Sequence, residues 1–304
     1  MSLPNQNSRK SVIYSQNFTV NPSLIAELIE RSSISQDDIV YEIGPGTGII
    51  TAELAKRCKK VVAIEIDKNL AKKLQIKFIN VPNVEVFEEN FLFYPLNEPK
   101  YKVFSNIPFN ITAAIIKKLT EAKNLPIDIF LFVQHDAAKK FLGAPNSKET
   151  QLSLLLKPIF ELSVTHQFKR NDFRPIPNVD IVLLRIKKRE KPMVEQQNEK
   201  LYRDFIIYSF NAWKPTLKEG LKKIFTDYQF LRLAKDLGFS SSAKPTDLNF
   251  SQWLGLFNFF TKGTDISKKK SLVKGSEDKI KNQQAKLDKI HRTRTAKDWR
   301  TVRE

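Results

Sequence analysis

Short apolar, largely β-branched runs alternate with segments of helical periodicity between Ser35 and Val133. This alternation is typical of βαβ units, in which helices join parallel strands. The apolar runs predict strands over residues 39–43, 61–65, 84–87, 103–105 and 127–133. The periodic segments predict helices near residues 22–31, 48–57, 68–79, 112–123 and 136–142. We therefore expect an α/β fold, a doubly wound Rossmann-like domain.

The pattern changes after this alternation. Residues 161–168 and 179–186 are close together around a proline-containing loop, which predicts an antiparallel pair at the sheet's edge. A charged segment with a proline, residues 187–195, is typical of a linker. Apolar residues then return at helical spacing up to Thr261. We expect a catalytic domain over residues 1–190 and a small all-helical, RNA-binding domain over 196–261.

The remaining residues, 262–304, carry 14 Lys or Arg against 6 Asp or Glu, with few large apolar side chains. This composition predicts a basic, flexible tail whose cations track phosphates. The whole chain has a net charge of +18, which indicates a polyanionic partner. Nucleic acid is the leading interpretation, an anionic membrane surface the second, and a merely soluble basic surface the third.

Several classes of protein are disfavoured by what the chain lacks. Its single cysteine, Cys58, excludes an intrachain disulfide, and with only three scattered histidines no Cys/His metal site of ordinary spacing can form. The first twenty residues show no secretory signal. The longest purely apolar run, Ile129–Val133, is far shorter than the roughly twenty residues that cross a bilayer. These features predict a soluble, cytoplasmic protein without a metal or a membrane span.

A glycine-rich motif, Glu42-Ile43-Gly44-Pro45-Gly46-Thr47-Gly48, follows one predicted strand and opens a helix. Glycines at such a turn let a ligand approach the backbone closely. The spacing G-x-G-x-G, with Pro45 between the first two glycines, favours S-adenosylmethionine over NAD. Glu65 ends the next strand, where an acid can accept hydrogen bonds from ribose hydroxyls. The alternative for Glu65 alone is a surface carboxylate.

A second motif, Asn106-Ile107-Pro108-Phe109, follows the fourth predicted strand. The exocyclic amine of an aromatic base is a poor nucleophile and must be oriented. The Asn106 amide oxygen and the Ile107 carbonyl can accept its two protons, while Pro108 aims that carbonyl and Phe109 stacks on the base. Methyl transfer then needs positioning and electrostatics without a covalent enzyme intermediate. The alternative is a strand-end turn with a buried aromatic.

Together with Ser15–Phe18 and Phe173–Asp180, these motifs resemble in kind and order those of the adenine-N6 methyltransferases of ribosomal RNA. The resemblance extends from about Arg9 to Thr261. Within that family, the Ile-Pro-Phe sequence with the following Asn-Ile-Thr, residues 168–182 and residues 252–257 are similar to the Erm-type enzymes that confer macrolide resistance. Housekeeping small-subunit dimethylases more often have Asn-Leu-Pro-Tyr.

The resemblance implies roles for further residues. Gln16, Asn17 and Phe18 would close over the methionine end of the cofactor. Phe173 would form the second wall of an aromatic clamp on the flipped adenine, opposite Phe109; without the resemblance, a core aromatic is nearly as good an interpretation. Asn90 stands where the family usually has an Asp that contacts the cofactor's adenine amine. An amide oxygen still accepts that bond but without charge, so weaker cofactor binding is expected.

The expected function is therefore S-adenosylmethionine-dependent methylation of one adenine N6 in large-subunit (23S) rRNA before full ribosome assembly, with resistance to macrolide, lincosamide and streptogramin B antibiotics. A small-subunit rRNA dimethylase of ribosome assembly is the nearest alternative, and a DNA adenine methyltransferase is a weaker one. A nonenzymatic nucleic-acid binder is the alternative from another class. The intact glycine loop and the intact Asn106–Phe109 motif argue against it.

Overall fold

The computed structural model describes residues 18–262 and 266–294, and the chain divides into two compact units. The first comprises Met1–Leu142 and Ile159–Lys191, and the second comprises Gly143–Pro158 and Pro192–Glu304. Residues 143–158, expected in the catalytic domain, thus belong to the second unit. They do so because Leu154 is buried in that unit's core, where its carbonyl accepts a hydrogen bond from the Tyr202 hydroxyl at 2.9 Å.

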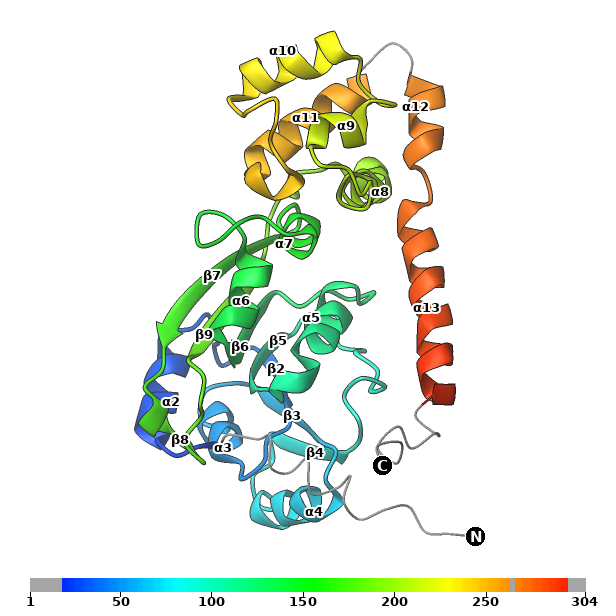
Figure 1. Ribbon diagram of the computed structural model, residues 1–304. Coiled ribbons are helices and arrows are strands. Elements are labelled where there is room, and N and C mark those ends of the chain that lie inside the picture. Colours follow the sequence, from blue (N-terminus) through cyan, green and yellow to red (C-terminus); the bar gives the residue numbers. More distant parts are fainter. Residues whose placement is uncertain (1–17, 263–265, 295–304) are drawn as a thin grey trace, which may run out of the picture. The chain divides into compact units, whose positions relative to one another are not determined.

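The first unit is built on a mixed sheet with the strand order β4-β3-β2-β5-β6-β9-β7 (Figure 1). Neighbouring strands from β4 to β6 are parallel, whereas β9 pairs antiparallel with both β6 and β7. The strands are β2 Ile39–Ile43, β3 Lys60–Glu65, β4 Val84–Glu88, β5 Lys102–Asn106, β6 Asp128–Gln134, β7 Phe160–Gln167 and β9 Ile181–Lys188. This confirms the Rossmann-like fold and the antiparallel pair at its edge.

The helices of this unit are α2 Pro22–Glu30, α3 Ile49–Ala55, α4 Lys68–Lys77, α5 Thr112–Thr120 and α6 His135–Leu142, with the short 3₁₀ helices η1 Phe109–Ile111 and η2 Arg170–Asp172. Helices α3, α4 and α5 connect parallel strands as expected, whereas α2 precedes β2 and α6 follows β6. Local sequence sets two of the helix starts. Asn21 caps α2 by accepting the Leu24 N–H at 3.1 Å, and Asp67 caps α4 by accepting the N–H groups of Asn69 and Leu70.

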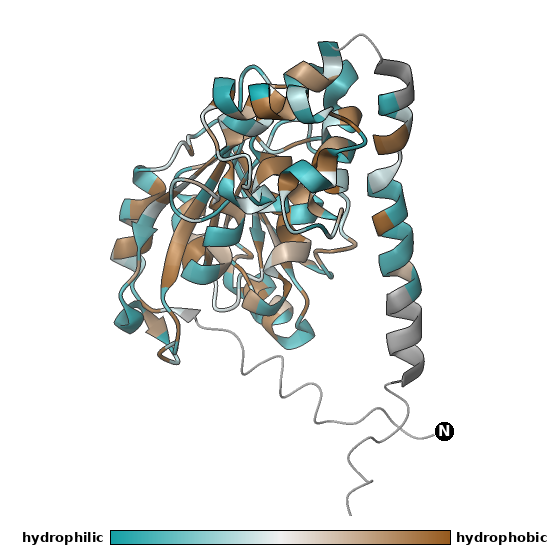
Figure 2. Ribbon diagram, turned by 45° about the horizontal axis from the view of Figure 1, so that its top comes forward, coloured by the Kyte–Doolittle hydropathy of each residue, from teal (hydrophilic) through white to brown (hydrophobic). Residues whose placement is uncertain are grey.

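The sheet carries the core of this unit. Strand residues such as Val40, Val61, Phe104 and Phe132 have no exposed surface. Figure 2 shows apolar residues concentrated on the strands, with hydrophilic residues spread over the helices. Strands that are buried on both faces in this way are typical of parallel sheets covered by helices.

Charged side chains meet at the amino ends of β5 and β6. Lys102 Nζ lies 2.7 Å from Asp38 Oδ2 and also donates to the carbonyl of Ser33. Asp128, which is 1% exposed, accepts hydrogen bonds from Arg185 Nε at 3.1 Å and Nη2 at 2.6 Å, and from the Ser33 hydroxyl at 2.7 Å. Burial alone would raise the pKa of Asp38, but hydrogen bonds from Lys102 and the Ser35 backbone hold it below its ordinary value. Asp38 and Asp128 therefore each have a cationic partner.

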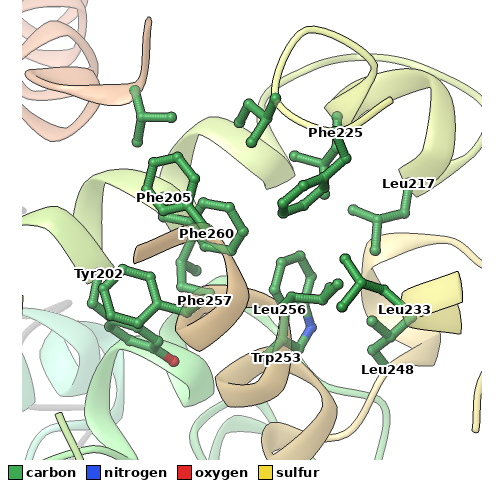
Figure 3. Close-up of a cluster of buried hydrophobic side chains, with 14 of the residues drawn as sticks. Tyr202, Phe205, Leu217, Phe225, Leu233, Leu248, Trp253, Leu256, Phe257 and Phe260 are labelled. Carbon is green, nitrogen blue, oxygen red and sulfur yellow. The ribbon is translucent and has the colours of Figure 1, made fainter. Parts of the chain in front are cut away.

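The second unit is helical, which confirms a helical C-terminal region. Its α-helices are α7 Gln151–Leu156, α8 Glu199–Phe210, α9 Leu217–Leu221, α10 Asp227–Leu237, α11 Phe250–Lys262, α12 Ile266–Val273 and α13 Ser276–Arg294, with 3₁₀ helices η3 Gln196–Asn198 and η4 Pro245–Asp247. Rings from α8 and α11 form the centre of its core (Figure 3). Phe205 stacks on Phe260 with ring centroids 5.0 Å apart, and the Trp253 indole donates to the Pro245 carbonyl.

Residues 266–294 differ from the flexible tail expected over residues 262–304; residues 263–265 and 295–304 lie outside the described residues. Helices α12 and α13 contact α8, and Val273 is fully buried in the helical core. Asp204 of α8 accepts the N–H groups of Gly275 and Glu277, both at 2.9 Å. Arg203 pairs with Glu277 through two hydrogen bonds of 3.0 and 2.7 Å. The acidic residues at the start of α13 thus anchor a segment that its composition alone predicts to be flexible and not packed against the domain.

Candidate functional site

The strand order places the candidate site beside β2. Strand β2 pairs with β3 on one side and with β5 on the other, so the connections run in opposite directions from this point of the sheet. Open α/β sheets bind ligands at the carboxyl ends of the strands at such a switch point. The glycine loop follows β2, Glu65 ends β3, and Asn106 ends β5. The topology therefore brings the two sequence motifs to one edge.

Strands β2 and β5 separate just before this edge. Backbone pairing joins Val40 to Lys102 and Tyr41 to Val103 and goes no further. Beyond it, the buried Ser105 hydroxyl accepts the Ile43 N–H at 3.0 Å and donates to the Ile43 carbonyl at 2.6 Å. Ser105 thus satisfies backbone groups that a continued ladder would have paired. The sequence motifs do not predict this role of Ser105. The sequence feature that could have indicated it is a hydroxyl residue within an otherwise apolar strand.

The glycine loop adopts the conformation that its composition requires. Gly44, Gly46 and Gly48 have φ angles of 65°, 58° and 76°, in the left-handed region that favours glycine. A Cβ added at Gly48 would also lie 2.7 Å from Leu74 Cδ2. The loop therefore needs its glycines both for the turn and for close packing against α4.

Glu65 braces this loop. Its side chain has no exposed surface, and its two carboxylate oxygens accept the N–H of Gly46 at 3.1 Å and the N–H of Asp67 at 2.9 Å. Burial raises its pKa above the ordinary value. Glu65 is thus not a surface carboxylate. A carboxylate oxygen can accept more than one hydrogen bond, so the ribose contact stays a prediction.

Glu42 provides a second buried carboxylate at the same edge. It accepts a hydrogen bond from the Thr51 hydroxyl at 2.6 Å. Burial, reinforced by the nearby charge of Glu65, raises the pKa of Glu42 to about 8. No ion pair joins either acid to a cation within residues 18–262 and 266–294. Two buried acids without a paired cation suit a positively charged ligand, because such a ligand stabilises their ionised forms.

The Asn106–Phe109 motif lies against the glycine loop. A Cβ built on Gly44 would lie 3.9 Å from Pro108 Cδ. Asn106 is half-buried at the end of β5, Ile107 is buried, and Phe109 is partly buried against the core. The backbone at Pro108 is extended, with φ −61° and ψ 123°, and η1 begins directly after it. The geometry brings the predicted amine-binding motif and the predicted cofactor loop side by side.

Phe173 lies in the core. This position matches the alternative given above to a wall of the adenine clamp, namely a core aromatic. It begins β8 (Phe173–Arg174) and has no exposed surface. Its ring contacts Phe168 and Phe132, with centroids 5.3 and 6.4 Å away. Such burial follows from apolar packing on the inner side of the sheet. A second wall of an adenine clamp would require an uncovered ring face, so that role stays a prediction.

The N-terminal segment is attached to the same motif. Strand β1 (Phe18–Thr19) pairs antiparallel with β8, which sets Phe18 opposite Arg174 and Thr19 opposite Phe173. The Val20 N–H also donates to the Asp172 carbonyl at 3.0 Å. Gln16 and Asn17 lie outside the described residues, and only the backbone of Phe18 is described. Their expected closure over the cofactor stays a prediction.

Asn90 follows β4, at the same edge. Its side-chain oxygen accepts the Leu92 N–H at 2.9 Å, and its carbonyl accepts the Phe93 N–H at the same distance. The Asn90 amide oxygen therefore already accepts a hydrogen bond within the turn, and a contact with the cofactor's adenine amine would use its second lone pair.

The sequence motifs leave out one apolar residue at this edge. Ile66, directly after Glu65, is 59% exposed. An apolar side chain next to an acid at a strand end is the available signal.

Two further classes of site are absent from the described residues. Among residues 18–262 and 266–294, no group of three or more His, Cys, Asp or Glu side chains is arranged to hold a metal ion. In that part of the chain, every helix is too short or too polar to cross a membrane.

Comparison with known proteins identifies the family of the chain. The profile of a family described as "Ribosomal RNA adenine dimethylase" matches residues 6–262. The chain is similar to an rRNA adenine N-6-methyltransferase of Lysinibacillus sphaericus, with 34% identity over 251 residues, which cover 81% of this chain and 95% of that protein. It is also similar to a ribosomal RNA small subunit methyltransferase A of Clostridium perfringens, with 30% identity over 72% of this chain and 79% of that one.

Two solved structures share the fold. The crystal structure of the 23S rRNA methyltransferase ErmE superposes with a TM-score of 0.74 at 28% identity and covers 80% of this chain and 98% of its own. A dimethyladenosine transferase from Plasmodium falciparum, at 22% identity and a TM-score of 0.66, covers 81% of this chain and 98% of its own, and shows likeness of fold alone. Both matches span the helical part as well as the sheet.

Proposed function

Because the chain belongs to the ribosomal RNA adenine dimethylase family and is an rRNA adenine N6-methyltransferase, we propose that its substrate is one adenine of large-subunit (23S) rRNA, modified before the ribosome is fully assembled. The modification would confer resistance to macrolide, lincosamide and streptogramin B antibiotics. Methyl groups on N6 remove hydrogen-bond donors and add bulk where such a drug packs.

One observation carries the catalytic part of the proposal. The glycine loop and the Asn106–Phe109 motif meet at the switch point, where Gly44 and Pro108 are neighbours. The residues present fit S-adenosylmethionine, because two buried acids without a paired cation, Glu42 and Glu65, suit its positive charge and the glycines admit a close approach. When bound, this cofactor supplies an activated methyl group on sulfur.

The chain's own residues orient the acceptor. The Asn106 amide oxygen and the Ile107 carbonyl accept hydrogen bonds from the two N–H groups of the adenine amine, which draws the nitrogen lone pair out of conjugation with the ring. The extended backbone at Pro108 fixes the direction of the preceding carbonyl. Phe109 offers a ring face to the base. Catalysis in this arrangement consists of positioning and preorganised dipoles.

The choice of 23S rRNA draws its support from the likeness to ErmE and from the Ile-Pro-Phe sequence of residues 107–109. A specific observation also favours a second candidate. Relatives named as small-subunit methyltransferases share 30% identity with the chain. Methylation of small-subunit rRNA is therefore the alternative that the test must separate.

Primer extension on rRNA from a susceptible bacterium, with and without the gene, separates the two. The proposal expects a new stop at one adenine of 23S rRNA, together with raised macrolide and lincosamide tolerance, and expects neither in cells that express Asn106→Ala. A stop in 16S rRNA with unchanged drug susceptibility would assign the enzyme to the small subunit. A soluble protein that produces no stop in either rRNA and transfers no tritiated methyl to either would be assigned to the alternative of a nonenzymatic nucleic-acid binder.

A further inference from the structure

A groove of about 490 Å³ lies in the second unit, apart from the residues assigned to catalysis. It is lined by the end of α8, by α9 and the residues after it, and by α12 and α13. The wall from α12 and α13 lies beyond residue 262, where the family match ends. The Asp204 and Arg203 contacts described above hold this wall against α8.

Trp213 is the most conspicuous residue of this groove. Its side chain is 90% exposed, although tryptophan is normally among the more buried residues. Its φ of 51° also places a non-glycine residue in the left-handed region, which is uncommon and costs conformational energy. The fold therefore holds a large aromatic ring in solvent at a conformational cost, and the ring lines a second groove beside Lys244 as well.

Lysines surround this ring. Lys214, Lys222, Lys223 and Lys279 line the groove, against the single carboxylate of Glu219. All four are exposed, and none forms an ion pair with another residue of the described part of the chain. Three other lysines of these helices do form ion pairs: Lys200 with Asp278, Lys218 with Asp227 and Lys281 with Glu277. Four lysines without an ion pair in the described part of the chain thus lie around Trp213.

An exposed aromatic ring among unpaired cations is the arrangement that binds single-stranded nucleic acid, in which a base stacks on the ring and phosphates lie against the cations. We propose that this groove binds an unpaired stretch of the rRNA substrate, with one base on Trp213 and neighbouring phosphates at Lys222, Lys223 and Lys279. The inference rests on the proposed function only in taking rRNA as the natural ligand. An acidic peptide would use the lysines but would gain little from the ring.

The test measures binding of the full-length protein to a fluorescein-labelled single-stranded RNA of fifteen nucleotides. Trp213→Asn removes the ring but keeps a residue that tolerates the left-handed backbone. It should weaken binding about ten- to hundredfold, whereas Trp213→Tyr should retain most of the affinity. Lys222→Gln with Lys223→Gln should flatten the plot of log affinity against log salt by about 0.7 for each phosphate that is no longer neutralised.

Tyr228, which is 75% exposed and does not line the groove, supplies the matched control. Tyr228→Ala should bind RNA like the wild type. Unchanged RNA binding by Trp213→Asn, an equal loss for Tyr228→Ala, or tight binding of poly-glutamate in place of RNA would each overturn the proposal. Titration of S-adenosylmethionine into each variant should give wild-type affinity. Because the probe RNA is not taken from 23S rRNA, a stop found in 16S rRNA would refute the proposed function and leave this test intact.

Discussion

The two ends of the central sheet use the same kinds of residue in opposite ways. At the amino end, Asp38 and Asp128 face Lys102 and Arg185, and each carboxylate has a cation within hydrogen-bond distance. At the carboxyl end, Glu42 and Glu65 are bonded to a hydroxyl and to backbone N–H groups. Paired charges stabilise the fold, whereas acids kept without a paired cation store a preference for a positive ligand. Stability and chemistry are thus assigned to opposite ends of the same strands.

The largest expected effect is on turnover at the carboxyl end. Asn106→Ala removes one acceptor for the target amine, so turnover should fall by about two orders of magnitude or more, the scale of removing one preorganised hydrogen-bonding group. The free energy of unfolding and the affinity for S-adenosylmethionine should change little. A tritiated-methyl transfer assay measures the turnover, and isothermal titration measures the affinity. Near-normal turnover of this variant would show that Asn106, at the carboxyl end of the sheet, does not orient the target amine.

At the amino end we expect the opposite result, a loss of stability with little change in turnover. Asp128→Asn keeps the side-chain shape but removes the charge that Arg185 and Ser33 bind, so the free energy of unfolding should fall by about 2 kcal/mol. Turnover of the folded protein should stay within about twofold of the wild type. Urea unfolding and the same transfer assay provide the comparison. A variant that is fully stable but inactive would contradict the division between the two ends.

A smaller effect concerns pH. Burial raises the pKa of Glu42 from an ordinary value of 4.5 to about 8, so the folded protein holds a proton there that the unfolded chain has released. Stability from this group is complete below about pH 4.5 and is lost as the pH rises toward 8. Between about pH 6 and pH 8 the wild type should lose about 2 kcal/mol more stability than Glu42→Gln. The free energy of unfolding is measured for both proteins at several pH values. The same pH dependence in both would show that Glu42 is not protonated in the folded protein.

The smallest expected effect tests Phe173. A buried ring predicts that Phe173→Leu lowers the free energy of unfolding by about 1 kcal/mol and keeps turnover within about threefold. Phe168→Leu, a neighbouring core ring, serves as the control and should behave alike. If Phe173→Leu instead lost activity at unchanged stability, the ring would be reassigned to the adenine clamp and thus to the carboxyl end.

Local patterns make most of the sheet and the site predictable. The apolar run over residues 39–43 predicts its strand to the residue, and the glycines of the loop take the positive φ angles for which glycine is selected. The features that the sequence does not predict are side-chain contacts between residues far apart in the chain. Ser105 bridges to Ile43 across 62 residues, and Arg203 meets Glu277 across 74. Charge counting over residues 262–304 cannot show that the first acids of α13 find Arg203 and Lys200.

The pairing of β1 with β8 also fixes an order of events during synthesis. Phe18 and Thr19 leave the ribosome early, but their partners are Arg174 and Phe173, more than half the chain later. Strand β6 likewise waits for β9, which begins at Ile181. A nascent chain that ends before Phe173 has its glycine loop but lacks β8, the partner of β1. The β1–β8 pair therefore forms only after Arg174 has been translated, and the central sheet is completed later still, by β9.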